Sequence, residues 1–195
     1  MNRTDVTELH YITLIETVPS IMQHGILSHT LADQLPHRSV AMPEIQERRR
    51  NKQIPGARML HDYANLYFDA HNAMLSKCRN RNNEICVLRV NSDVLDLPGV
   101  IVTDRNAATD LVRFRSMAEG LEHLDAARLF ARYWTHQDDL YDQARHKAEK
   151  CAEVLVSDKV DKETIIGAYV ANKVALGLFQ ALNTGLPVEI HGMFF

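Results

Sequence analysis

The stretch Cys151-Ala152-Glu153-Val154-Leu155-Val156 decides the fold. A highly charged segment, residues 138–150, precedes it and is typical of a polar helix. The apolar run that follows Glu153 is typical of a buried strand. A carboxylate at the start of such a strand can face a cleft while its neighbours anchor it. On the pattern alone, the simpler interpretation is that Glu153 is only the first solvated residue of the strand.

Outward from this stretch, strands and helices are mixed without the regular alternation of parallel βαβ units, which favours an α+β fold. Pro19 and Gly25 indicate the start and the end of one short helix. The spacing of apolar residues predicts strands over residues 9–14, 63–68, 84–90, 100–103, 153–156, 164–170 and 188–190. It predicts helices over residues 17–25, around 74–75, and over 121–134, 138–150 and 171–182, with a further short helix starting at Pro43.

Composition indicates a globular protein, and residues 1–195 are expected to form a single domain. The hydrophobic fraction is 46% and the charged fraction is 24%. No apolar run approaches the length of a membrane span, and the first residues lack an apolar signal core. Three cysteines without paired spacing favour a reducing cytoplasm. A net charge of −3 argues against a protein that coats nucleic acid by bulk attraction.

A local cationic patch, Arg48-Arg49-Arg50-Asn51-Lys52, contrasts with this overall charge. Guanidinium groups match phosphate oxygens in geometry, so the patch could bind a dinucleotide or a short stretch of nucleic acid. A solvated helix face explains it equally well. Neither G-x-G-x-x-G nor a Walker loop occurs, so a dinucleotide would need a different cradle.

Ten histidines raise the question of a metal, but none stands in an H-E-x-x-H or Cys/His spacing. No metal is therefore expected. Cys151 has no evident histidine base and is expected in the core. Tyr133 and Trp134 are expected to pack on the apolar face of the helix over residues 121–134.

Several pieces, taken together and in order, resemble the DarT family of DNA ADP-ribosyltransferase toxins. The most specific pieces are Ile45-Gln46-Glu47-Arg48-Arg49 and Leu60-His61-Asp62-Tyr63. The others are Ile12-Thr13, the helix from Val18 to Gly25, Tyr67-Phe68, Met74-Leu75, Thr103-Asp104-Arg105, Tyr133-Trp134 and Ala152-Glu153.

The resemblance implies the ADP-ribosyltransferase fold, in which two facing β-sheets grip NAD⁺ in a cleft between them. It implies that Glu153 is the catalytic glutamate and that Arg49 binds the NAD⁺ phosphates and assists the transfer. The nicotinamide end would lie against Thr13 with His10 or Tyr11. The family has a histidine directly before Ile-Thr, where this chain has Tyr11. Tyr67 is a further expected cofactor contact.

The resemblance also implies single-stranded DNA as the substrate, with His71, Met74, Arg105 and Asn106 near the target base. Thymidine-modifying members have a histidine where this chain has Asn106. An amide can hydrogen-bond a purine edge, so guanine is favoured over thymine. The implied partner is an antitoxin that removes ADP-ribose.

Three alternatives remain open at this point. One is a non-catalytic DNA-binding regulator, which would bind DNA in a salt-dependent way without releasing nicotinamide. A second is an ADP-ribosyltransferase that acts on RNA or protein. A third is a metal-dependent hydrolase, which chelators would inhibit.

Overall fold

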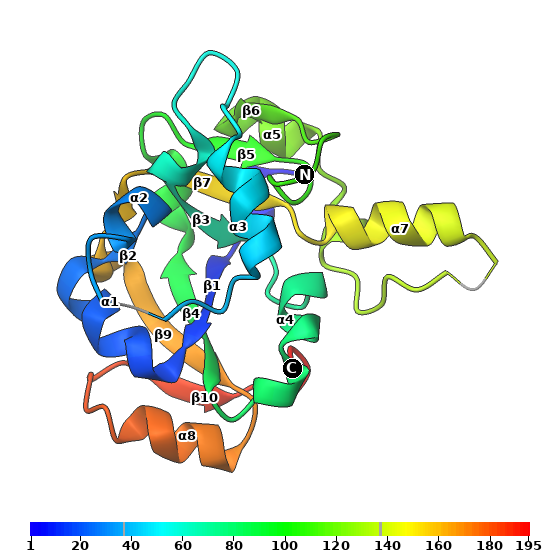
Figure 1. Ribbon diagram of the computed structural model, residues 1–195. Helices are drawn as coiled ribbons and strands as arrows, with labels where there is room; N and C mark the ends of the chain where they lie inside the picture. Colours follow the sequence, from blue (N-terminus) through cyan, green and yellow to red (C-terminus); the bar gives the residue numbers. More distant parts are fainter. Residues whose placement is uncertain (37, 137) are drawn as a thin grey trace.

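The computed structural model describes residues 1–36, 38–136 and 138–195, which form an α+β fold (Figure 1). The strands are β1 Glu8–Leu14, β2 Ile26–Leu27, β3 Tyr63–Tyr67, β4 Ile85–Asn91, β5 Ile101–Thr103, β6 Phe114–Ser116, β7 Glu153–Ser157, β8 Lys159–Val160, β9 Ile165–Val170 and β10 Val188–Ile190. The helices are α1 Val18–His24, α2 His29–Ala32, α3 Pro43–Arg50, α4 Ala73–Lys77, α5 Met117–Glu122, α6 Ala126–Leu129, α7 Leu140–Glu149 and α8 Lys173–Gln180.

Eight strands form one sheet in the order β10-β9-β4-β1-β3-β7-β5-β6, and β2 pairs with β8 beside it. The two halves of the large sheet join at β1 and β3, where the register contains one residue pair, His10 with Tyr67. Beyond that pair, β1 stays bonded to β4 and β3 stays bonded to β7. The two facing sheets expected from the sequence are therefore the two halves of one hydrogen-bonded sheet that separates between β1 and β3.

The strands beside the separation are almost completely buried, which explains their apolar sequences. In β7, every residue from Glu153 to Val156 is buried, because β7 lies between β3 and β5 and is covered on both faces. In β4, the residues from Ile85 to Leu88 are buried for the same reason. A strand covered on both faces has a nearly continuous hydrophobic run instead of an alternating one.

Local signals fix the helices that lie near this separation. Pro19 lies in the first turn of α1, and Gly25 ends the helix with φ 86°. A Cβ atom at Gly25 would lie 2.5 Å from the carbonyl oxygen of Val160, so strand β8 also requires glycine there. Helix α3 starts at Pro43 as predicted. The buried Asn72 side chain accepts hydrogen bonds from two backbone amides of α4, which begins shortly after β3.

Most predicted elements are confirmed within a few residues, but the helix predicted over residues 121–134 is wrong. Two short helices, α5 and α6, lie there and are separated at Asp125, which is extended and caps α6. The Lys150 ammonium group binds the carbonyl oxygens of Leu129 and Ala131, two groups that a continuing helix would use internally. Tyr133 consequently lies 66% exposed instead of packing on an apolar helix face. The short strands β2, β6 and β8 and the short helix α2 were not predicted.

Helix α7 projects from the body of the protein on the same side as α4, whereas α8 lies next to β10 at the opposite end from α5 and β6 (Figure 1). None of the helices in the described ranges is both long and apolar enough to cross a bilayer.

Candidate active site

A cavity of about 780 Å³ lies where β1 and β3 separate. Tyr11, Ile12 and Thr13 line it from β1, and Tyr63, Asn65 and Tyr67 line it from β3. These are the parts of the two strands that are not paired with each other, apart from Tyr67 at their junction, so the opening of the sheet itself provides the space. Helices α3, α4 and α7 contribute further lining residues.

The Glu153 carboxylate lies beneath this cavity, behind Arg49, and is completely buried. Its two oxygens accept hydrogen bonds from Arg49 Nη1 at 3.1 and 3.0 Å. Its Oε1 atom also accepts one from the backbone amide of Ala107 at 2.9 Å. A buried carboxylate requires such donors, because removing an ionised group from water is otherwise very unfavourable. The carboxylate is therefore held at a defined position under the cavity.

Helix α3 brings Arg49 to Glu153 across 104 positions of sequence. Arg49 is the buried residue of its helix, whereas Arg48 and Arg50 on either side are exposed. The His61 ring nitrogen Nε2 lies 3.1 Å from the Gln46 side-chain oxygen, which ties α3 to the turn before β3. Burial, then the neighbouring charges of His29 and Arg49, lower the pKa of His61 to about 4. His61 is therefore neutral at physiological pH.

Thr103 and Tyr67 hold Glu153 from the two strands that flank β7. The Thr103 hydroxyl accepts a hydrogen bond from the Glu153 amide at 2.9 Å and donates one to the carbonyl oxygen of Arg105 at 2.7 Å. Tyr67 is the register partner of Glu153 in β3. Burial, and next the negative charge of Glu153, raise the pKa of Tyr67 well above its usual value. The phenol therefore stays protonated and can act as a hydrogen-bond donor.

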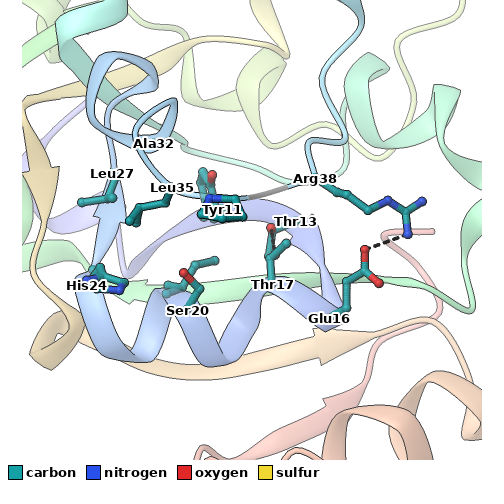
Figure 2. Close-up of a pocket in the computed structure, with 13 residues that line it drawn as sticks. Tyr11, Thr13, Glu16, Thr17, Ser20, His24, Leu27, Ala32, Leu35 and Arg38 are labelled. Atoms are coloured by element: carbon teal, nitrogen blue, oxygen red, sulfur yellow. Dashed lines mark hydrogen bonds and ion pairs between the residues drawn. The ribbon is translucent and has the colours of Figure 1, made fainter.

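A second cavity of about 520 Å³ adjoins the first and shares Tyr11, Thr13, Leu27, Ala32 and Arg38 with it. Helix α1 provides part of its lining. Figure 2 shows the ion pair between Glu16 and Arg38, 2.8 Å long, at one end of this cavity, with His24 and Leu27 at the other end. The second cavity thus extends the space beside β1 along α1.

The lining of the first cavity is strongly cationic although the chain as a whole is acidic. Of the described residues that line it, none is an aspartate or a glutamate, and the cations are Arg38, Arg48, Arg49, Lys77, Arg81 and Lys147. A concave surface lined by one sign of charge concentrates counter-ions of the other sign. The geometry therefore suits a ligand that carries several phosphates.

The structure brings together seven of the side chains singled out from the sequence. Arg49 and Glu153 are bonded to each other, and the cavity above them is lined by Tyr11, Thr13, Tyr67, Met74 and Asn106. The Asn106 side-chain oxygen accepts a hydrogen bond from the amide of Ala108 at 2.8 Å. The amide nitrogen is thus the group of this side chain that remains to donate toward the cavity.

Three predicted site residues lie elsewhere. His10 points away from Tyr11, as neighbours on a strand do, and lines a separate cavity of about 270 Å³ together with His71. The His71 ring lies 5.1 Å from the Trp134 ring, and its Nε2 atom lies 2.9 Å from the carbonyl oxygen of Arg132. Arg105 forms an ion pair with Asp104 at 3.0 Å and does not line the first cavity.

Sequence reasoning missed the groups that support Glu153 and the cations contributed by separate helices. The amide of Ala107 carries no side-chain signal, and the hydroxyl of Thr103 is one among many in the sequence. A buried ion pair between Lys150 and Asp69 joins the end of α7 to the segment after β3. Among the described residues, no three His, Cys, Asp or Glu side chains are grouped as metal ligands would be.

The separated sheet, with an arginine–glutamate pair beneath its opening, defines an ADP-ribosyltransferase-like fold. Residues 10–191 match the model of a family described as "ssDNA thymidine ADP-ribosyltransferase, DarT". The chain therefore belongs to the DarT family of DNA ADP-ribosyltransferases.

Two curated relatives support this assignment. A DNA ADP-ribosyl transferase–DNA ADP-ribosyl glycohydrolase fusion protein of Thermosipho africanus is 28% identical over 200 residues, which is 96% of this chain and 49% of the fusion. The chain thus spans about half the length of that relative. A DNA ADP-ribosyl transferase of Thermus sp. is 30% identical over 170 residues, which is 80% of this chain and 78% of the relative.

Solved structures show the same fold. The Thermosipho africanus DarTG structure in complex with ADP-ribose has a TM-score of 0.84 at 28% identity and covers 97% of this chain and 51% of its own. Thermus sp. DarT in complex with ADP-ribosylated ssDNA has a TM-score of 0.80 at 24% identity, and the match covers 98% of this chain and 97% of the Thermus chain. The same Thermus protein in complex with NAD⁺ has a TM-score of 0.75 at 22% identity, and the match covers 97% of this chain and 98% of the Thermus chain.

Proposed function

We propose that this protein transfers ADP-ribose from NAD⁺ to a nucleobase of single-stranded DNA and releases nicotinamide. The observation that carries the proposal is the fully buried Glu153 carboxylate, paired with Arg49 beneath a cavity lined by cations. The family description and the relatives solved with NAD⁺ and with ADP-ribosylated ssDNA support the choice of both substrates.

In this proposal, NAD⁺ lies along the two adjoining cavities, with its nicotinamide end against Tyr11 and Thr13. Arg49 offsets the charge of the pyrophosphate. Because Arg49 both lines the cavity and covers Glu153, binding of the pyrophosphate draws its guanidinium toward the cavity and uncovers the carboxylate. His10 lies on the other side of β1 and takes no part in this arrangement.

The chemical step is a displacement at C1′ of the nicotinamide ribose. The bond between C1′ and the nicotinamide nitrogen breaks, and the bond between C1′ and a base nitrogen forms. Glu153 accepts the proton that the base nitrogen loses, and its negative charge stabilises the oxocarbenium-like ribose. A single strand presents its bases without the unpairing free energy that a duplex requires.

Asn106 is the residue proposed to select the base, since it lines the cavity close to Ala107 and Glu153. Its amide nitrogen can donate to a base carbonyl oxygen, which guanine and thymine both present beside a ring N–H. Guanine is the proposed target, because this chain lacks a histidine at position 106. Thymine, the base of the family's description, is the alternative that the test must separate.

The test is mass spectrometry of four oligonucleotides that differ only in one central base, each incubated with protein and NAD⁺. RNA of the same sequence and a mixed protein substrate provide the arms for other acceptors. Glu153→Gln is expected to lower the rate of transfer about 10³-fold or more. Glu163→Gln, an exposed glutamate outside the cavity, is the matched control. Labelling by Glu153→Gln at the wild-type rate would contradict the proposal, as would labelling of RNA or protein in place of DNA.

A toxin role follows from this chemistry, because ADP-ribose on a template base obstructs copying of the DNA. We expect the protein to act in the cytoplasm, where its free cysteines Cys78, Cys86 and Cys151 stay reduced. The expected partner is an antitoxin that removes ADP-ribose from the base, as the fusion of the Thermosipho relative to a glycohydrolase suggests. Expression of the wild type should stop bacterial growth, Glu153→Gln should not, and a co-expressed DNA ADP-ribosyl glycohydrolase should restore growth.

A further inference from the structure

Three of the cavity cations lie away from the Arg49–Glu153 pair and have no part in the mechanism above. Lys77 is at the end of α4, Arg81 is in the short 3-10 helix Arg79–Arg81 that follows it, and Lys147 is on α7. The first two lie on one wall of the cavity and Lys147 lies on another. Cys151 and Met74 line the same cavity, and the backbone of Ala73 and Met74 is hydrogen-bonded to the Cys151 thiol.

We infer that Lys77 and Arg81 on one side and Lys147 on the other bind the phosphates that flank the target nucleotide. The inference rests on the proposed function, because it takes the polyanion in the cavity to be the DNA strand. These two walls hold the strand by its backbone while the base between them turns toward Glu153.

The environment of the three cations supports this assignment. Lys147 is exposed and lines the cavity beside Ala144 and Ala148 on α7. Alanines at these positions leave room for a sugar–phosphate backbone to approach the helix closely. A larger side chain on this face would fill the space next to the ammonium group.

On the wall formed by α4, Lys77 is exposed, and its ammonium group contacts the Met42 sulfur at 3.6 Å, a contact that does not compensate its charge. Arg81 donates to Glu84 at 3.0 and 3.2 Å, an exposed pair. Exposed ion pairs of this type contribute little and can exchange for a phosphate. Glu84 also does not line the cavity, so the cavity side of this wall stays cationic.

The acidic side chains Asp142 and Glu149 of α7 pair with arginines that do not line the cavity. Asp142 and Glu149 form ion pairs with Arg128, at 3.0 and 2.6 Å, and Glu149 also pairs with Arg145 at 2.7 Å. Their charges are therefore compensated away from Lys147, which is the cation that α7 presents to the cavity.

The experiment measures binding of a fluorescent single-stranded oligonucleotide by anisotropy over a series of salt concentrations, with no NAD⁺ present. For single strands, each phosphate contact contributes about 0.7 to the slope of log K against log salt. Lys77→Ala and Lys147→Ala should each lower the slope by about 0.7, and the double variant should lose about twice as much. Lys162→Ala, an exposed lysine outside the cavity, should leave the slope unchanged.

A second readout separates strand binding from catalysis. In each lysine variant the KM for the oligonucleotide should rise, while binding of NAD⁺ measured calorimetrically should match the wild type. Slopes equal to that of Lys162→Ala, or a parallel loss of NAD⁺ binding, would overturn the inference. If the slopes change as expected but the wild type transfers no ADP-ribose to DNA, the proposed function fails and the strand-binding surface stands.

Discussion

The buried pair between Arg49 and Glu153 makes a sharp prediction about stability. In Arg49→Ala, the completely buried Glu153 carboxylate loses its counter-charge and keeps the Ala107 amide as a donor. Removing one partner of a buried ion pair typically lowers the free energy of unfolding by about 3–5 kcal/mol, because the remaining charge is left without compensation. Arg49→Ala is expected to show a loss of this size.

Removing the other partner is expected to be less harmful. The side chain introduced by Glu153→Gln keeps an oxygen that can accept from the Ala107 amide. Arg49 lines the cavity and can turn its guanidinium toward water. The loss should then approach the value of hydrogen bonds to a charged group, about 1.5–3 kcal/mol.

The measurement is a double-mutant cycle by equilibrium unfolding in urea, followed by circular dichroism. The double variant Arg49→Ala/Glu153→Gln should be more stable than Arg49→Ala alone, because it no longer buries an uncompensated carboxylate. Arg50→Ala is the matched control, since Arg50 is the exposed neighbour on α3 and pairs with Glu47 at 3.1 Å. Such surface pairs contribute about 0–1 kcal/mol.

Two results would refute this reasoning. One is a loss in Arg49→Ala no larger than the loss in Arg50→Ala. The other is additivity of the two single losses within about 0.5 kcal/mol, which is the behaviour of residues that do not interact. Either result would mean that Glu153 is solvated or is held by other groups.

Three further predictions concern the supports of the site. Thr103→Val removes the acceptor for the Glu153 amide and should lower the free energy of unfolding by about 1–3 kcal/mol, measured in urea. The folded-state pKa of His61 is about 4, below the ordinary value of 6.5, so the unfolded state binds the proton first as pH falls. The free energy of unfolding should therefore fall between about pH 6.5 and pH 4. A His61→Gln variant should lose this part of the pH dependence of the urea midpoint. Gly25→Ala places a Cβ against the Val160 carbonyl oxygen at a left-handed φ, and its melting temperature should fall below that of Gly177→Ala, where a Cβ has open space.

The helices and strands that are determined by residues adjacent in the sequence could be predicted from it. The apolar run after Glu153 identifies β7, and Pro43 identifies the start of α3. The predicted helix over residues 121–134 failed because distant groups decide that segment. The periodicity of Leu121, Leu124 and Leu129 is real, since all three are buried, but Lys150 takes the carbonyl oxygens at its end.

The arrangement of the candidate site could be predicted only in part. A glutamate before a strand and an arginine in a cationic helix were visible separately, but a pair joined across 104 positions depends on the tertiary fold. Alternation along β1 could have shown that His10 and Tyr11 point to opposite faces. The resemblance to the family carried the assignment of Glu153, because the residue pattern alone favoured a solvated strand end.

Under the proposed function, the distribution of charge allows an acidic protein to bind DNA without coating it. The chain carries a net charge of −3, yet the described lining of the large cavity contains cations and no carboxylate. Exposed charges are screened beyond about 10 Å at 0.1 M salt, so a strand responds to the cavity mouth and not to the charge of the whole molecule. Attraction is thus limited to the place where Glu153 lies beneath the surface.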